Sequence, residues 1–402
     1  MIQGKSIEQA SVKRQRTIGV VTVARSDYGI YQPLLHEISR TPGLRLWLFV
    51  GGMHLSRRHG MTVRMIEADG YTIAGRANFR MTGDESPAAI AQALGRGVSA
   101  FARALEKRRP DVLVVLGDRY DMHAAALAAL PMKIPLAHIH GGEITEGAMD
   151  DALRHCITKL SHLHFPATTE YAHRIRQLGE EPWRITPSGA PALDRLKNFK
   201  PMPCRQLEEK FNLDLSAPVL LATFHPVTLE HENTARDVAA FLGAIGDSGM
   251  PAVFTLPNAD TRGREIATTI RAFIVKHPKH RLVENFGGDA YFSMMHHAAA
   301  MVGNSSSGII EAPSFVLPVV NIGNRQCGRT RGANVIDVPP DRRKILAAIR
   351  RSLRPEYRCA LRKTKNPYGE GHSCRRIVAK LYRTTLDDNL LIKRFHDSGG
   401  RR

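Results

Sequence analysis

The chain has 402 residues, of which 43% are hydrophobic, so it can form two or three cored domains and is not disordered throughout. The 57 Lys and Arg against 38 Asp and Glu give a net charge of +19, but no basic segment interleaves aromatic residues for base stacking. No apolar run approaches the ~18 residues of a membrane-spanning helix, and residues 1–16 lack the apolar centre of a secretory signal. We therefore expect a soluble protein with neither a nucleic acid nor a membrane as partner.

The five cysteines are scattered and none forms a CxxC pair, which excludes a zinc knuckle and a redox motif. A large chain without a disulfide framework is typical of a reducing compartment, so we expect a cytoplasmic protein. Positive charge gathers in residues 339–402, where 18 Lys and Arg against 6 Asp and Glu contribute +12 of the total of +19. We interpret this segment as a solvated basic surface.

Short apolar runs alternate along the chain with longer amphipathic stretches. In chain order we expect strands at Thr17–Ala24, Leu44–Val50, Asp111–Leu116, Ile134–Ile139, His162–Pro166, Val219–Thr223, Ala252–Leu256, Arg281–Val283, Ala300–Val302 and Val316–Ile322. The clearest helices are expected at Ile30–Arg40, Pro87–Lys107 and about Asp150–Ser161. Strands that alternate with helices predict mostly parallel, doubly wound sheets.

A segment rich in proline and glycine, Thr186–Pro203, separates two runs of strands and predicts a hinge. We therefore expect an α/β protein with two Rossmann-like domains that face each other across a cleft, at residues 17–190 and 191–365. Residues 1–16 and the basic tail, residues 385–402, are expected to be flexible.

Sequence motifs for common cofactors and metals are missing. No G-x-G-x-x-G is present, so neither half carries the fingerprint of a dinucleotide site, and we expect no cofactor. The HEXXH and EF-hand spacings are also absent, so we expect no metal.

In open α/β sheets, ligands bind beyond the carboxyl ends of the strands, so polar clusters that directly follow a strand are candidate site residues. Arg25 follows the first strand and could bind a phosphate together with the N–H groups of the next helix. Ser26 or Asp27 could instead simply cap that helix. Asp118 and Arg119 follow the strand DVLVVL, where the pair is either structural or catalytic.

The densest cluster spans residues 138–155, on a strand end and the next helix. It contains three histidines, three carboxylates and one arginine: His138, His140, Glu143, Asp150, Asp151, Arg154 and His155. The last three lie within one helical turn, on one face. Such groups can hold a metal, but acid–base chemistry fits better because histidine and carboxylates exchange protons near neutral pH.

A fourth cluster, Gly303–Glu311, joins a strand to a helix. The hydroxyls of Ser305 and Ser306, together with helix N–H groups, suit a diphosphate, and Glu311 could accept hydrogen bonds from ribose hydroxyls. Neighbouring strand ends add cations and a histidine that should face the same cleft: His225, Arg325 and Arg329.

With these clusters the chain resembles the UDP-N-acetylglucosamine 2-epimerases, specifically the hydrolysing branch that supplies sialic-acid-type sugar pathways. The resemblance runs from about Thr17 to Ala379. Its motifs are RSDYG at Arg25–Gly29, LGDRYD at Leu116–Asp121, HIHGGE at His138–Glu143, DDALRHCITKLSHLHF at Asp150–Phe165, GNSSSGIIEAPS from Gly303 and NIGNRQCGRTRGANVIDV at Asn321–Val338.

The resemblance implies a glycosyltransferase-B-like fold in which the C-terminal domain holds most of the UDP and a final helix, within residues 366–384, returns to the first domain. The implied UDP contacts are Arg25, His225, Ser305, Ser306, Glu311 and Arg325, with Asn258 and Asp260 lining the same cleft. The acid–base candidates are Asp118, Glu143 and Asp150 or Asp151. We add His225 as a catalytic candidate, and as substrate-binding candidates Asp27, Arg119, Arg154, His155 and Arg329.

One position departs from the family pattern. The non-hydrolysing relatives and some hydrolysing ones carry Glu where this chain has His140. Either His140 transfers a proton or Glu143 substitutes for the missing carboxylate, and the residues alone leave both possibilities open.

The implied reaction removes the C2 proton of UDP-N-acetylglucosamine, eliminates UDP and rehydrates the glycal, giving N-acetylmannosamine and UDP. An alternative substrate is UDP-2,4-diacetamido-2,4,6-trideoxyglucose of the legionaminic acid branch, because both sugars share the features that the motifs recognise. A UDP-sugar glycosyltransferase and an inactive sugar-nucleotide-binding regulator are further alternatives. We expect a homodimer or a homotetramer.

Overall fold

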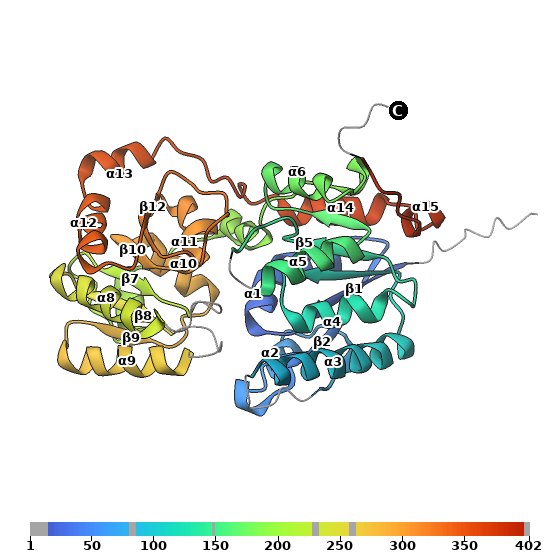
Figure 1. Cartoon of the computed structure of the whole chain (residues 1–402), viewed down its shortest axis with the longest axis horizontal. Helices are drawn as coiled ribbons and strands as arrows, with labels where there is room; N and C mark the ends of the chain where they lie inside the picture. Colours follow the sequence, from blue (N-terminus) through green and yellow to red (C-terminus); the bar gives the residue numbers. More distant parts are fainter. Residues whose placement is uncertain (1–14, 80–85, 147–148, 227–232, 257–262, 398–402) are drawn as a thin grey trace, which may run out of the picture.

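Two six-stranded parallel sheets, each flanked by helices, lie side by side in the computed structural model of the chain (Figure 1). The structure describes residues 15–79, 86–146, 149–226, 233–256 and 263–397. This arrangement confirms the predicted α/β class with two Rossmann-like halves. No helix among these residues is both long and apolar enough to cross a membrane.

The first sheet has the strand order β3-β2-β1-β4-β5-β6. Its strands are β1 (Arg16–Thr22), β2 (Leu44–Gly51), β3 (Ile73–Ala77), β4 (Val112–Leu116), β5 (Leu136–Ile139) and β6 (Leu163–Phe165). The helices around it are α1 (Arg25–Arg40), α2 (Val63–Ala68), α3 (Pro87–Lys107), α4 (Tyr120–Ala129), α5 (Met149–Leu160) and α6 (Thr169–Gln177). Every residue of β4 is buried, as expected for a central parallel strand that is covered on both faces.

The second sheet has the order β12-β11-β10-β7-β8-β9. Its strands are β7 (Leu220–Thr223), β8 (Ala252–Thr255), β9 (Arg281–Val283), β10 (Ala300–Gly303), β11 (Val319–Ile322) and β12 (Val335–Val338). The accompanying helices are α7 (Cys204–Phe211), α8 (Thr234–Asp247), α9 (Gly263–Lys276), α10 (Gly288–His297), α11 (Ser307–Ile310), α12 (Arg342–Ser352) and α13 (Pro355–Leu361).

Each sheet reverses its strand order at one point, between β1 and β4 in the first and between β10 and β7 in the second. In doubly wound sheets the ligand crevice lies at the carboxyl ends of the strands beside such a reversal. The topology therefore directs attention to the residues that follow these four strands.

After α13 the chain crosses back to the first half and forms α14 (Ser373–Arg383), which packs against α1 (Figure 1). Asp194 fixes the start of α14, because its carboxylate accepts hydrogen bonds from the backbone N–H groups of Ser373 and Cys374, both at 2.8 Å. Ile377 and Leu381 are fully buried in the core of the first sheet. The domain limits given above stay a prediction.

Some expected elements differ from the observed ones. The strands β3 and β12 were not predicted, because IAGRA and VIDV are short and only partly buried. Val316 does not belong to β11; it follows the 3₁₀ turn Ala312–Phe315 with a positive φ of 54°, which ends that turn.

The prediction of a flexible tail from residue 385 is wrong for residues 385–397. The short helix α15 (Asp388–Leu391) lies there, and Leu390 is fully buried in the first core. Arg184 holds the segment by donating hydrogen bonds to the carbonyl oxygens of Leu390 at 2.8 Å and Asn389 at 2.7 Å. Backbone carbonyls at the end of a helix are natural partners for a guanidinium group, which composition alone does not reveal.

Candidate active site

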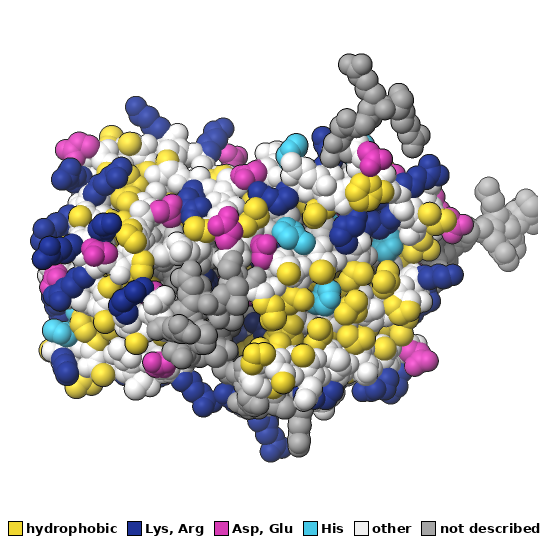
Figure 2. Space-filling model, viewed as in Figure 1, with side chains coloured by type: hydrophobic (Ala, Val, Ile, Leu, Met, Phe, Trp, Pro, Cys, Tyr) yellow, Lys and Arg dark blue, Asp and Glu magenta, His cyan; other side chains and the backbone are white. Residues whose placement is uncertain are grey.

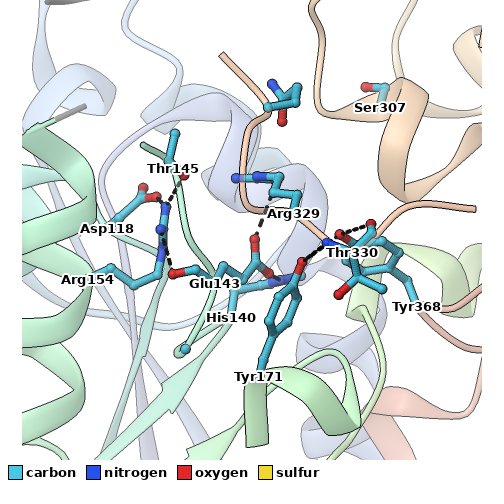
Figure 3. A network of polar contacts seen from close by, with 12 residues as sticks. Asp118, His140, Glu143, Thr145, Arg154, Tyr171, Ser307, Arg329, Thr330 and Tyr368 are labelled. Carbon is cyan, nitrogen blue, oxygen red and sulfur yellow. Dashed lines mark hydrogen bonds and ion pairs between the residues drawn. The ribbon is translucent and has the colours of Figure 1, made fainter. Parts of the chain in front are cut away.

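Arg154, on α5, organises the polar groups at the carboxyl end of the first sheet (Figure 3). Its side chain is only 1% exposed and forms an ion pair with Asp118, which follows β4. It also donates hydrogen bonds to the carbonyl oxygen of Glu143 at 3.0 Å and to Oγ1 of Thr145 at 2.9 Å. A buried arginine with several acceptors fixes the positions of all of them.

Glu143 lies between a histidine and an arginine (Figure 3). Its Oε1 is 2.5 Å from Nδ1 of His140, and its Oε2 is 3.4 Å from Nη1 of Arg329, which comes from the second half of the chain. Burial alone would raise the pKa of Glu143, but Arg329, His140 and Arg154 outweigh it and lower this pKa to about 2. Glu143 therefore stays ionised at neutral pH.

His140 has a positive φ of 62°, an uncommon conformation for a residue other than glycine and one that functional sites often contain. An ionised Glu143 accepts a hydrogen bond from Nδ1–H, which leaves Nε2 as the nitrogen able to take or give a proton. This arrangement resembles the histidine–carboxylate pair of hydrolases, where the carboxylate orients the imidazole.

His138 has a structural environment. It is fully buried, it donates a hydrogen bond from Nε2 to the carbonyl oxygen of Gly117 at 2.8 Å, and burial lowers its pKa to about 3. Gly117 has a φ of 72°, the left-handed conformation that glycine adopts easily. His138 is therefore neutral and supports the turn that presents Asp118.

The structure brings Asp151 and His155 together with Arg154, as their spacing predicted. Asp151 accepts a hydrogen bond from the backbone N–H of Thr145 at 2.6 Å and lies 3.3 Å from Arg154. Nε2 of His155 is 3.5 Å from the other oxygen of Asp151. Asp151 thus braces the Thr145 turn, whereas Asp150 lies half-buried in the first turn of the same helix.

A ring of hydrogen bonds that the sequence did not indicate holds the loop of Arg329 (Figure 3). The N–H of Thr330 donates to the hydroxyl of Tyr171 at 2.8 Å, and the hydroxyl of Tyr368 donates to the carbonyl oxygen of Thr330 at 2.9 Å. The two hydroxyls are 2.8 Å apart. Because Tyr368 gives its proton to Thr330, Tyr171 must donate to Tyr368. This closed ring fixes the residue next to Arg329.

Glu311 directly follows the helix α11, beside the second sheet. It interacts electrostatically with His140 and Glu143 of the first half. Burial raises its pKa to about 7, an effect that the charges of His140 and Arg329 partly oppose. Its Oε2 is buried and has no hydrogen-bond partner among the described residues. A buried, unpaired carboxyl oxygen is suited to accept a hydrogen bond from a ligand hydroxyl.

Ser305 and Ser306 lie at the start of α11, as predicted, and Oγ of Ser305 accepts a weak hydrogen bond from the backbone N–H of Ser307 at 3.4 Å. Sequence reasoning missed Tyr291 on α10, whose hydroxyl interacts with the side chains of Ser305 and Ser307. Burial raises the pKa of Tyr291 to about 12, so this hydroxyl remains protonated and can donate. An aromatic residue within an apolar helix gave no sequence signal for such a role.

Asn304 links the ends of β7 and β10. Its side chain accepts a hydrogen bond from the N–H of His225 at 2.7 Å and donates one to the carbonyl oxygen of His225 at 2.8 Å. Arg325 and Gln326 donate to the carbonyl oxygen of Asn304 at 3.1 and 2.9 Å. Burial, with the charge of Arg325, lowers the pKa of His225 well below its ordinary value, so His225 is neutral. A cavity of about 160 Å³ lies beside Asn304.

Three residues near the first sheet were predicted to contact the ligand: Asp27, Arg25 and Arg119. The structure gives each of them a different environment. Asp27 is buried and accepts hydrogen bonds from the N–H groups of Val23 and Ala24, both at 2.9 Å, so it caps α1 and is not presented to a ligand. Arg25 is exposed at the start of α1, where it can reach a ligand. Arg119 pairs with the buried Asp121 at 3.1 Å.

Two further candidates, Asn258 and Asp260, lie outside the described residues. Within the described ranges no group of three or more histidine, cysteine or carboxylate side chains is arranged to hold a metal ion.

The chain is similar to known proteins over most of its length. The family described as UDP-N-acetylglucosamine 2-epimerase matches residues 36–382. The chain is 38% identical to GDP/UDP-N,N'-diacetylbacillosamine 2-epimerase (hydrolyzing) of Campylobacter jejuni, over 80% of this chain and 84% of that protein. It is 35% identical to UDP-N,N'-diacetylbacillosamine 2-epimerase (hydrolyzing) of Legionella pneumophila, over 94% and 98%.

A solved structure has the same fold. UDP-GlcNAc 2-epimerase from Neisseria meningitidis, bound to UDP-GlcNAc, superposes with a TM-score of 0.77 at 19% identity, covering 92% of this chain and 100% of that one. The strand-end clusters, the fold and the extent of the match lead to one conclusion: the chain belongs to the UDP-N-acetylglucosamine 2-epimerase family, in its hydrolysing branch.

Proposed function

We propose that the chain is a hydrolysing 2-epimerase whose substrate is UDP-N,N'-diacetylbacillosamine, that is, UDP-2,4-diacetamido-2,4,6-trideoxyglucose. Two relatives at 38% and 35% identity carry this sugar in their names, whereas a Neisseria meningitidis relative named UDP-N-acetylglucosamine 2-epimerase is 30% identical. UDP-N-acetylglucosamine, our first expectation, thereby becomes the second candidate. The products are UDP and the free 2-epimeric sugar.

The observation that carries the reaction class is the His140–Glu143–Arg329 arrangement between the two sheets. Loss of the C2 proton and cleavage of the C1–O bond to UDP give a glycal, and water then adds its oxygen at C1 while a proton returns to C2 from the opposite face. His140 Nε2 is our candidate for proton transfer, with Glu143 as its orienting partner. Asp118, held by Arg154, is the candidate for the second proton transfer.

The second sheet supplies groups that suit UDP. The hydroxyls of Ser305 and Ser306, which directly precede α11, and the cation Arg325 favour the diphosphate, while the unpaired oxygen of Glu311 favours a ribose hydroxyl. A departing UDP carries its negative charge toward these donors, which stabilises the elimination step.

The reaction can be tested by incubating the enzyme with each UDP-sugar in D₂O and, separately, in ¹⁸O-labelled water. We expect a free manno-configured sugar with deuterium at C2 and solvent oxygen at C1, unlabelled UDP, and a higher kcat/KM for the diacetamido sugar. GDP-linked sugar belongs in the same comparison, because the Campylobacter relative's name includes GDP. A released sugar with protium at C2 and gluco configuration would refute the elimination route.

His140→Ala should abolish label incorporation, and His173→Ala is a matched control because His173 is exposed on α6. Turnover without an acceptor sugar also separates this proposal from a glycosyltransferase, which needs an acceptor. A higher kcat/KM on UDP-N-acetylglucosamine would support the proposed reaction class but would show that UDP-N-acetylglucosamine, not the diacetamido sugar, is the preferred substrate.

We also propose that the protein self-associates through the face formed by α3 and α4. Most of α4 is buried within this half, so the argument rests on the hydrophobic side chains that stay exposed beside it, because an exposed apolar patch often marks a protein–protein contact. Figure 2 shows a broad hydrophobic area over this part of the first half, and Leu130, at the end of α4, is 46% exposed. Light scattering should give a dimer or tetramer that Leu130→Glu weakens; a monomer at assay concentrations would contradict the proposal.

A cytoplasmic location is part of the same proposal. All five cysteines are free, in agreement with a reducing environment.

A further inference from the structure

A second cavity, of about 720 Å³, lies between α14, the 3₁₀ turn Pro182–Arg184 and the segment that carries α15. None of its lining residues belongs to the candidate active site described above. Figure 1 places α14 and α15 on the first half of the molecule. The cavity is therefore separate from the site to which the reaction is assigned.

Four cations line this cavity: Arg376, Lys380, Arg383 and Arg394. Among the described residues none of the four forms an ion pair with a carboxylate; Arg376 donates to the carbonyl oxygen of Ser188 at 3.2 Å and Lys380 to that of Trp183 at 2.7 Å. Uncompensated positive charges around one cavity repel each other, and an anion removes that repulsion.

Two carboxylates also line the cavity, but both are already engaged. Glu181 lies 2.7 Å from Nε of the buried Arg184. Asp387 caps α15, because its Oδ1 accepts a hydrogen bond from the N–H of Leu390 at 3.1 Å. Among the described residues neither carboxylate forms an ion pair with the four cations, because Glu181 meets Arg394 only through the backbone N–H of Arg394. The cavity therefore keeps an excess of positive charge.

Trp183 forms an aromatic wall of the same cavity. Its ring is held by the guanidinium group of Arg184, 4.2 Å from the ring centroid, and by the ammonium group of Lys380 at 5.5 Å. Burial and the charge of Arg184 lower the pKa of Lys380, which agrees with a surplus of positive charge there. Trp183 is 42% exposed, so a bound molecule can contact the ring.

We infer that this cavity is a second binding site, for a small molecule that carries a phosphate or diphosphate group. Arginine side chains bind phosphate oxygens with paired N–H groups, and three of the four cations are arginines. The aromatic wall can accommodate a ring attached to the phosphate. This inference does not rest on the proposed function.

The test uses Trp183 as a reporter. The chain has two tryptophans, Trp47 and Trp183, so Trp47→Phe leaves Trp183 as the sole indole. Titration of this variant with inorganic pyrophosphate at about 0.15 M salt, where surface charge is screened, should give a saturable fluorescence change. The same affinity is expected with saturating UDP present, because UDP occupies the active site.

Removing two arginines from the cavity should weaken pyrophosphate binding by about tenfold or more. The variant is Arg376→Gln with Arg383→Gln; both side chains are exposed, so the core stays intact. Arg343→Gln with Arg350→Gln on α12 removes the same charge elsewhere and should leave the affinity unchanged. Arg394→Gln, on the tail, gives an independent third measurement.

Several results would overturn the inference. These are no saturable change, equal loss of affinity in both double variants, competition by UDP, or preferential binding of malonate, a dicarboxylate. Equal loss would mean a general effect of net charge, and competition by UDP would mean that pyrophosphate binds in the active site.

Discussion

Replacing Glu311 by Gln tests whether the second sheet presents an unsatisfied carboxyl group to the active site. Burial raises the pKa of Glu311 from 4.5 to about 7, while His140 and Arg329 oppose the rise. In the unfolded chain the same group titrates at its ordinary value. Glu311 therefore contributes stability that is fully present below pH 4.5 and is lost as the pH rises through about 7.

The magnitude follows from the two pKa values. Their difference corresponds to about 3 kcal/mol at about 1.36 kcal/mol per pH unit, an upper bound because the side chain is partly accessible. Gln is neutral at every pH, so Glu311→Gln should match the parent protein near pH 4.5 and exceed its stability above pH 8. For 402 residues this is a rise in Tm of up to about 4 °C.

Scanning calorimetry at both pH values measures this difference. Glu209→Gln, at an exposed position on α7, is a matched control and should shift Tm equally at the two pH values. If a ribose hydroxyl donates to Glu311, UDP binding near pH 7 should also release a proton, which titration calorimetry in two buffers detects. A Tm difference for Glu311→Gln that does not change with pH would refute the assignment of a buried, unpaired carboxyl.

Four other predictions concern the same site. Asp118→Asn should lower kcat by about 10²- to 10⁴-fold and change UDP affinity much less, because it removes the proposed proton-transfer group and keeps its shape; near-normal turnover removes Asp118 from the mechanism. Arg325→Ala should weaken UDP binding in calorimetry, and unchanged affinity would exclude a phosphate contact. His140→Ala should lower kcat more than Glu143→Gln, and the reverse order would make Glu143 the proton-transfer group. Exhaustive chelation should leave activity intact; loss that divalent ions restore would show a metal requirement.

The sequence was most informative at strand ends. Asp118, His140, His225 and Ser305 could be identified as candidates because each follows an apolar run, and parallel strands bring their carboxyl ends to one edge of a sheet. This rule needs strand assignments only, and strands such as VLVVL are recognisable from local composition.

Partnerships between distant residues could not be derived in this way. The contact of Arg329 with Glu143 joins the two halves of the chain, and the ring of Thr330, Tyr171 and Tyr368 joins three separate segments. No local periodicity encodes which residues of different domains meet. The capping role of Asp27 was a local alternative, and the structure favours it because both nearby N–H groups point at its carboxylate.

The negative charge of Glu143 explains why a histidine at position 140 is more favourable than a second carboxylate. Oε1 of Glu143 lies 2.5 Å from Nδ1 of His140 in a buried environment, with Arg329 on the other oxygen. A second carboxylate at position 140 would place two negative charges together, and one of them would have to hold a proton. An imidazole avoids this repulsion, donates a hydrogen bond through Nδ1 and keeps Nε2 available. His140 and Glu143 therefore form one hydrogen-bonded pair in which Glu143 keeps its charge, and our proposal assigns the proton transfer to His140.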